Sequence, residues 1–126
     1  MQFSELAKYF AKLENTASRN EMTVILADLF KKSTSDEIGN ICYLLQGRVL
    51  PLFEPIEFGL ADKMMLKAMA RAYNQKEDEV SNFFKKDGDL GITAEKLNSK
   101  GQIKSRLSVT QVYLSFYDLA TTTGAG

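Results

Sequence analysis

Apolar residues recur along this chain at the spacing of one helix face, in segments separated by short polar stretches. The second segment shows this most clearly, with an i, i+3, i+4, i+7, i+8 pattern and charged residues in between. Its apolar positions are Met22, Ile25, Leu26, Leu29 and Phe30. The alternation typical of strands is nowhere sustained, so the chain is expected to be all-α, a compact bundle of about six to seven short helices. The predicted helices cover residues 3–14, 19–32, 35–46, 59–73, 76–86, 92–98 and 109–120.

Local sequence signals mark the ends of several of these helices. Ser4 is the expected N-cap of the first helix. Capping boxes, in which the first and fourth residues satisfy each other's amides, are predicted at residues 18–21, 34–37 and 108–111. Gly88 is expected to end the fifth helix, since glycine commonly follows the last helical turn.

The other helices also have apolar faces that predict one buried core. Their predicted core positions are Phe3, Leu6, Ala7, Phe10 and Leu13 in the first helix, Ile38, Ile41, Cys42 and Leu45 in the third, Met64, Met65, Ala68, Met69 and Ala72 in the fourth, Val80, Phe83 and Phe84 in the fifth, and Val112, Tyr113, Phe116, Tyr117 and Ala120 in the last. Cys42 and the methionines are interpreted as core rather than as metal or redox sites, because these residue types are commonly buried. Residues 47–59 contain both prolines among apolar residues and are expected to form a loop that packs.

The length and composition of the chain limit which functions are plausible for such a bundle. The length of 126 residues is enough for about one domain, and sixteen basic residues balance sixteen acidic ones. This balance gives no general signature of nucleic-acid binding, so any such contact has to be local. The chain has no histidine, which argues against hydrolytic triads and zinc sites. One cysteine, no signal peptide and no membrane-length apolar run predict a cytoplasmic protein.

Short motifs in a fixed order resemble a known family. They are KLENT at residues 12–16 after FSELA at 3–7, YLLQG at 43–47, GLADKMMLKA at 59–68, GDLG at 88–91, LSVTQVY at 107–113 and TTGAG at 122–126. Together they are similar to the N-terminal DNA-binding domain of ATP-dependent DNA ligases, archaeal ones above all. The resemblance extends over essentially the whole chain. An ordered series of this kind is far more specific than any single short match.

This resemblance implies that the chain is the front part of that domain, a truncated piece without ligation chemistry. Family members grip nicked double-stranded DNA through phosphate and minor-groove contacts in DNA replication, repair and recombination. The expected partners are nicked DNA and the other ligase parts, namely the rest of the DNA-binding domain, the nucleotidyltransferase domain and the OB-fold. The parent ligase would use ATP and magnesium, while no cofactor or metal is expected in this chain itself. In a prokaryote the protein would be associated with the nucleoid.

One motif imitates catalytic chemistry. Lys85-Lys86-Asp87-Gly88 spells K-x-D-G, the pattern of the adenylated lysine in the catalytic domain of ligases. That lysine works only beside a nucleotide pocket built from further motifs, for which this chain is too short. We interpret the motif as a helix C-terminus, where cations and a following glycine are favourable, and expect no catalytic residue.

The candidate DNA-binding residues are of three kinds. Thr123, Gly124 and Gly126 match the family's glycine-rich segment, where a close backbone approach to phosphate competes with a plain glycine C-cap as the interpretation. Arg19 and Asn20 stand at a helix start, which either binds an anion or carries solvated capping residues. Lys104 and Arg106, with Lys100, form a small basic group that is either solvated or in contact with phosphate. Residues 88–91 are interpreted as a structural turn and cap.

Two other functions stay open from the sequence alone. A helical protein-interaction module without DNA binding fits the zero net charge and an apolar face that absent helices would normally cover, and this face could also drive self-association. A minimal nucleotidyltransferase using Lys85 predicts a covalent AMP adduct. Even as a DNA-binding piece the isolated chain is expected to bind weakly, because phosphate contacts add up and part of the domain is absent.

Overall fold

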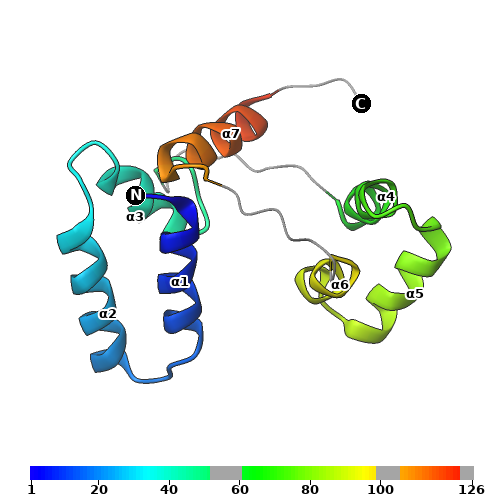
Figure 1. The fold of residues 1–126 in the computed structure, drawn as a ribbon, viewed down its shortest axis with the longest axis horizontal. Coiled ribbons are helices and arrows are strands. Elements are labelled where there is room, and N and C mark those ends of the chain that lie inside the picture. The colour runs from blue at the N-terminus through cyan, green and yellow to red at the C-terminus, as the bar shows by residue number, and fades with distance from the viewer. Residues whose placement is uncertain (52–60, 99–105, 123–126) are drawn as a thin grey trace. The chain divides into compact units, whose positions relative to one another are not determined.

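The computed structural model describes residues 1–51, 61–98 and 106–122. Within these ranges the regular structure is helical, and the one β contact is an isolated antiparallel bridge between Gln2 and Ser108. The helices are α1 (Phe3–Glu14), α2 (Arg19–Lys32), α3 (Ile38–Leu45), α4 (Asp62–Ala72), α5 (Glu77–Asp87), α6 (Leu90–Leu97) and α7 (Val109–Thr121) (Figure 1). The predicted all-α fold class is confirmed.

The helices belong to two compact units. Unit 1 consists of residues 1–58 and 105–126 and contains α1, α2, α3 and α7, while unit 2 consists of residues 59–104 and contains α4, α5 and α6. Each unit has its own cluster of buried side chains, so the apolar positions of the sequence serve two small cores. The sequence pattern alone predicted one core, because periodicity shows which face is buried and not what it is buried against.

The core of unit 1 is built where α1 and α2 pack as an antiparallel hairpin with α3 and α7 (Figure 1). Its buried members are Leu6, Tyr9, Leu29, Ile41 and Val109. Removing a side chain of this size from water contributes roughly 1.5–3 kcal/mol. Tyr9 is buried although it lay outside the predicted stripe, because its hydroxyl donates to Asp28 Oδ2 at 2.8 Å.

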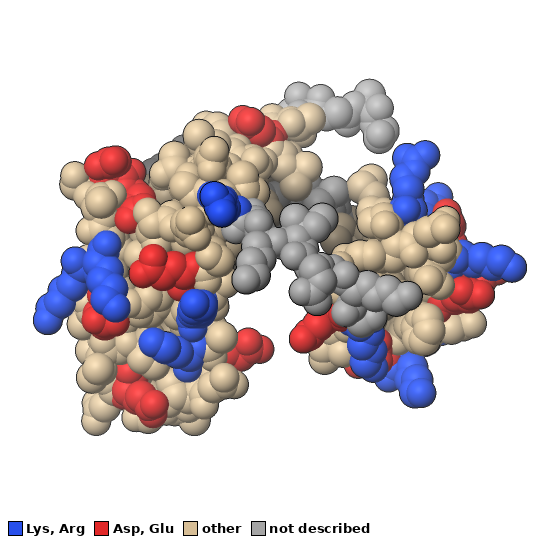
Figure 2. Space-filling model, viewed as in Figure 1, with Lys and Arg blue, Asp and Glu red and all other residues tan. Residues whose placement is uncertain are grey.

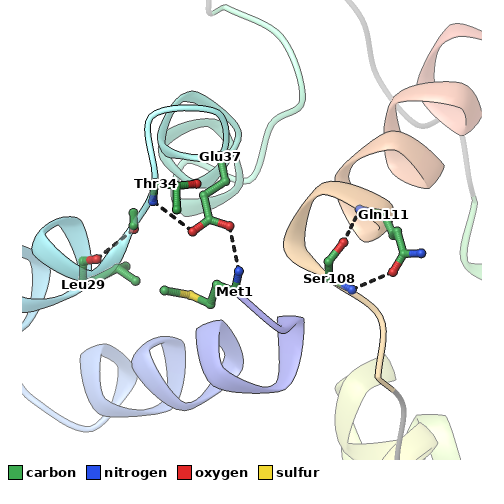
Figure 3. Close-up of polar contacts among 7 residues, drawn as sticks. Met1, Leu29, Thr34, Glu37, Ser108 and Gln111 are labelled. Atoms are coloured by element: carbon green, nitrogen blue, oxygen red, sulfur yellow. Dashed lines mark hydrogen bonds and ion pairs between the residues drawn. The ribbon is translucent and has the colours of Figure 1, made fainter.

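The first residues of the chain are held against the start of α7. The amide of Phe3 donates to the carbonyl of Leu107 at 2.8 Å, and the amide of Val109 donates to the carbonyl of Met1 at 2.9 Å. The N-terminal ammonium group donates to Glu37 Oε2 at 2.9 Å, and Figure 3 shows the Glu37 carboxylate between Met1 and Thr34. These contacts fix the beginning of α7 in unit 1.

Glu37 is one of the few charged side chains in the core, 5% exposed. Burial raises the pKa of its carboxyl group, but the hydrogen bonds from the N-terminal ammonium and from the Thr34 amide outweigh this effect. The pKa therefore lies below its usual value. The ionised carboxylate is the form that joins residue 1 to the segment before α3.

The core of unit 2 is smaller. It contains Met69, Ala70 and Val80, with half-buried apolar side chains from α4, α5 and α6 around them. Thr93 is fully buried in this unit because its hydroxyl donates to Asp87 Oδ2 at 3.1 Å. Asp87 also pairs with Lys96, and the hydrogen bond from Lys96, followed by that from Thr93, holds the pKa of Asp87 below its usual range.

Several predicted helix ends need correction. The N-cap of α1 is Gln2 without a side-chain cap bond, so Ser4 lies inside the helix. The third helix begins at Ile38 rather than residue 35, because the Glu37 carboxylate caps the Thr34 amide across a turn. The sixth helix begins at Leu90 rather than residue 92, because Asp89 is its N-cap and accepts the Ile92 amide at 2.9 Å.

Other predicted ends are confirmed. Gly88 follows α5 in the left-handed conformation, with φ of 71°, as a helix-ending glycine should. Gly47 has a φ of 68° just after α3. The beginning of the predicted apolar loop packs, since the Tyr113 hydroxyl donates to the carbonyl of Val49. The remainder of that loop, from residue 52, lies outside the described residues, as do the first two residues of the predicted fourth helix.

Some positions predicted as core are exposed. They are Ala7, Phe30 (40% exposed), Met64 (50%), Ala68, Ala72, Phe83 (46%), Phe116 (39%) and Tyr117 (36%). In α4 the buried residues are Met69 and Ala70, so the buried face is turned toward Ala70 and Tyr73 and away from Met64. The broad run of small and flexible side chains hid which of two adjacent faces was buried.

Candidate nucleic-acid interface

Arg19 and Asn20 are the first two residues of α2, and both are exposed. The helix begins here because Ser18 adopts an extended conformation and its Oγ accepts the amide of Glu21 at 3.2 Å. The next amide, that of Met22, donates to the Ser18 carbonyl at 3.0 Å. Among the described residues, the amides of Arg19 and Asn20 donate to no protein acceptor.

The predicted capping box at this helix start is half formed. Glu21 does not return a bond to the Ser18 amide, because its Oε2 accepts from the Thr16 hydroxyl at 2.7 Å. The Thr16 hydroxyl oxygen in turn accepts the Ser18 amide at 3.2 Å. None of these bonds involves the amides of Arg19 and Asn20, so two open amides and the exposed Arg19 guanidinium lie at the positive end of α2, a geometry that binds anions such as phosphate.

At the start of α7 more of the backbone amides have acceptors within the protein. Ser108 Oγ accepts the Gln111 amide at 3.1 Å and Gln111 Oε1 accepts the Ser108 amide at 2.8 Å, so this predicted capping box is confirmed (Figure 3). The Val109 amide is taken by the Met1 carbonyl. Of the first two helical amides, only that of Thr110 donates to no protein acceptor among the described residues, so the start of α7 has one open amide where α2 has two.

Arg106 is exposed and lies two residues before the Ser108 cap. It does not join the Arg19 and Asn20 group, because α2 begins at the end of the α1–α2 hairpin that is remote from α7 (Figure 1). Unit 1 therefore keeps its predicted basic candidates at two separate places. Thr123, Gly124, Gly126 and Lys104 lie outside the described residues, as does Lys100.

Several other cations of unit 1 are engaged within the protein. Lys32 pairs with Asp28 at 3.4 Å, and the ammonium groups of Lys12 and Lys32 lie 5.1 and 5.7 Å from the centre of the Tyr9 ring. The hydrogen bond from Tyr9, followed by that from Lys32, holds the pKa of Asp28 below its usual value. Arg19, by contrast, forms no ion pair among the described residues.

The K-x-D-G sequence lies at the end of α5. Lys85 and Lys86 are exposed in its last turn, Gly88 is its C-cap, and Asp87 is engaged by Lys96 and Thr93. This is the helix-end geometry expected from the sequence. In the ranges that the structure describes, no three His, Cys, Asp or Glu side chains gather as metal ligands, and no helix is long and apolar enough to cross a membrane.

The exposed face of α4 carries cations that the sequence analysis did not select. Lys63, Lys67 and Arg71 follow one another at i, i+4 and i+8, and all three are exposed. The spacing was a usable signal, because residues four apart lie on the same side of a helix. The apolar positions of the same helix form the stronger pattern, and they alternate in sequence with these cations.

Comparison with known proteins shows the family of the chain. The chain is 47% identical over its full length to a probable DNA ligase of Dictyoglomus thermophilum, 40% identical to a DNA ligase of Staphylothermus marinus and 38% identical to a DNA ligase of Saccharolobus solfataricus. It spans 21–24% of the length of these relatives. Residues 2–126 match the family model described as DNA ligase N terminus. The chain therefore belongs to the DNA ligase N-terminus family.

Proposed function

We propose that this chain is the non-catalytic DNA-binding portion of an ATP-dependent DNA ligase, which grips nicked duplex DNA through its phosphates and minor groove. The observation that carries the proposal is the open start of α2, where the amides of Arg19 and Asn20 and the Arg19 guanidinium face solvent together. Backbone amides at a helix N-terminus bind phosphate without reading sequence, as an enzyme that seals nicks anywhere requires.

Family membership gives this anion site its expected ligand. The relatives are named DNA ligases, and their shared N-terminal region corresponds to this chain. The proposal extends to the parent protein, which would use ATP and magnesium in its other domains during replication and repair. In this chain, Lys85 is proposed to have no catalytic role, and intact mass unchanged after incubation with ATP and magnesium is the expected result.

The proposal is tested by following backbone amides while nicked duplex DNA is added to the 126-residue chain. The amide resonances of Arg19 and Asn20 are expected to shift strongly, whereas the amide of Val109, already held by the Met1 carbonyl, should shift little. Equal or absent shifts at the two helix starts would contradict the proposed contact.

A matched pair of variants adds a second readout. Arg19→Gln and Lys31→Gln each remove one exposed cation from the same helix, at its first and last turns respectively. Arg19→Gln is expected to weaken DNA binding more than Lys31→Gln, because only Arg19 lies beside the open amides. Equal losses of DNA affinity in the two variants would show that Arg19 contributes only through the net charge of the chain.

A helical protein-interaction module is the second candidate, favoured by exposed apolar side chains on α7. Leu114 is 51% exposed, Leu119 is 41% exposed and Phe116 is 39% exposed. Exposed apolar patches mark protein contacts, here with the remaining ligase domains or with a second copy of the chain. Sedimentation that shows concentration-dependent dimers, together with no DNA binding, would favour this second function.

A further inference from the structure

We propose that unit 2 carries a phosphate-binding row of its own, formed by Lys63, Lys67 and Arg71 on α4, which contacts the backbone of duplex DNA. This inference rests on the proposed DNA-binding function and adds a second contact surface to it. These three residues together form the α4 row.

The α4 row is evenly spaced and winds slowly around the helix, by about 40° at each step of four residues. Successive members are four residues apart, so with a rise of about 1.5 Å per residue the row extends over about 12 Å of helix. One strand of duplex DNA presents a phosphate about every 3.4 Å along the axis, so the row faces about three to four phosphates. In Figure 2, blue side chains project from the part of unit 2 where Figure 1 labels α4.

The cations of the α4 row are available to a ligand. All three side chains are exposed, and the ion pairs found among the described residues include none of them. The Lys96 ammonium in the same unit is instead paired with Asp87. When an unpaired cation of the protein binds a DNA phosphate, it releases a counterion that was condensed on the DNA, and this release favours binding. Lys96 would first have to break its ion pair with Asp87.

The surface beside the α4 row permits a close approach. Lys67 and Arg71 border an open depression of about 850 Å³, and Ala68 and Ala72 lie in the same lining. Short side chains between long cations let a sugar-phosphate backbone reach the helix surface. Asn74 and Gln75, in the polar turn that follows α4, also line the depression.

Two carboxylates lie near this surface. Asp62 is in the first turn of α4, and Glu77 is the one acid among the described residues that line the depression. Neither forms an ion pair with the α4 row. The first turn of α5 carries two more acids, Asp78 and Glu79. The preference for a polyanion over an acidic peptide therefore rests on the even spacing of the three cations and not on a local excess of positive charge.

The test compares two double variants of the full chain. Lys67→Gln/Arg71→Gln removes two members of the α4 row, and Lys85→Gln/Lys86→Gln removes two exposed lysines from the same unit with the same change in net charge. Binding to nicked and to intact duplex of equal length is measured over a range of salt concentrations. Circular dichroism confirms that both variants keep the helix content of the wild type.

Log affinity falls as log salt rises, and the α4 variant is expected to make this negative slope shallower by about 2, close to 0.9 for each lost phosphate contact. The loss in affinity should be the same factor for nicked and intact duplex, because phosphate contacts carry no information about the nick. The control variant should change the slope by less than about 1.

Other outcomes overturn the inference. Equal slopes for the two variants would show that only net charge matters, and an unchanged slope in the α4 variant would remove the row from the interface while leaving the start of α2 in place. Absence of DNA binding by the wild type would contradict the proposed function as well. Vesicles of phosphatidylglycerol and phosphatidylcholine supply the second source of phosphate. Sedimentation with them that is lost in the α4 variant, with DNA binding retained, would assign the row to a membrane surface.

Discussion

The starts of α2 and α7 have the same sequence pattern and different structures. Residues 18–21 and 108–111 both begin with serine and end with a side chain that can return a bond to the serine amide. At α7 both bonds form, and the Met1 carbonyl takes one further amide. At α2 the Thr16 hydroxyl donates to Glu21 and accepts the Ser18 amide, and no carbonyl of the described residues accepts the Arg19 amide, so the amides of Arg19 and Asn20 are both open. A capping motif therefore predicts where a helix begins, while its neighbours decide whether the helix end is available to a ligand.

The start of α7 depends on the anchored N-terminus of the chain. Removing the anion that holds this N-terminus should therefore have the largest effect on stability. Glu37→Gln is expected to lower the free energy of unfolding by about 3 kcal/mol at neutral pH, because it leaves the buried N-terminal ammonium without an anion. Chemical denaturation of the wild type and the variant measures this difference. A change below about 1 kcal/mol would contradict the anchoring role.

The same pair predicts a pH dependence. The pKa of Glu37 is lower in the folded chain than its usual value of 4.5, so the stabilisation is complete above 4.5 and is lost as the pH falls through the folded value. The difference in stability between the wild type and Glu37→Gln should therefore shrink under acid. A difference that stays constant down to strongly acid pH would show that the carboxylate charge is not involved.

The next largest effect is expected from truncating the first residue of each helix, Val109 in α7 and Arg19 in α2. Val109 is fully buried in the core of unit 1, and Arg19 is exposed. Val109→Ala is expected to cost about 2 kcal/mol through lost burial and a cavity, while Arg19→Ala should change stability by less than about 0.5 kcal/mol. Thermal and denaturant unfolding measure both. Equal costs would mean that the α2 start is packed rather than open.

Removing the caps themselves should give a smaller contrast. Ser108→Ala loses the cap of a complete box and is expected to destabilise the protein by about 1 to 2 kcal/mol, whereas Ser18→Ala should cost about 0.5 to 1 kcal/mol. Both changes are read from the same denaturation curves. A larger cost at Ser18 would reverse the ranking of the two helix ends.

The smallest effect is expected from Thr16→Val, which removes the hydroxyl that holds Glu21 away from the Ser18 amide. Glu21 is then free to complete the box, so stability should change by less than about 0.5 kcal/mol. The Ser18 amide should stay protected from hydrogen exchange, because the Glu21 carboxylate replaces the Thr16 hydroxyl as its acceptor. Rapid exchange at this amide would show that the box cannot form here.

The sequence predicted much of this architecture because helix signals are local. Helix signals in the sequence located each of the seven helices found in the described residues, and Gly88 marked the end of α5 as expected. The burial of Tyr9 could not be predicted in this way, because it depends on a hydroxyl bond to Asp28 on another helix. The division into two cores depends on which faces meet, and that information is not local.

The candidate site was predicted only in part. The exposure of Arg19 and Asn20 at a helix start was expected, but the half-formed box was not, because the competing Thr16 lies outside the four-residue motif. The α4 row was missed although its spacing was visible. Thr123, Gly124, Gly126 and Lys104 stay predictions.

The most direct test of the central claim is the salt dependence of nicked-duplex binding by the 126-residue chain. The account predicts that log affinity falls linearly with log salt concentration and that Kd at physiological salt is about 10⁻⁴ to 10⁻⁶ M, the range of contacts made mainly with phosphates. Absence of binding at low salt, or an affinity that does not change with salt, would contradict it.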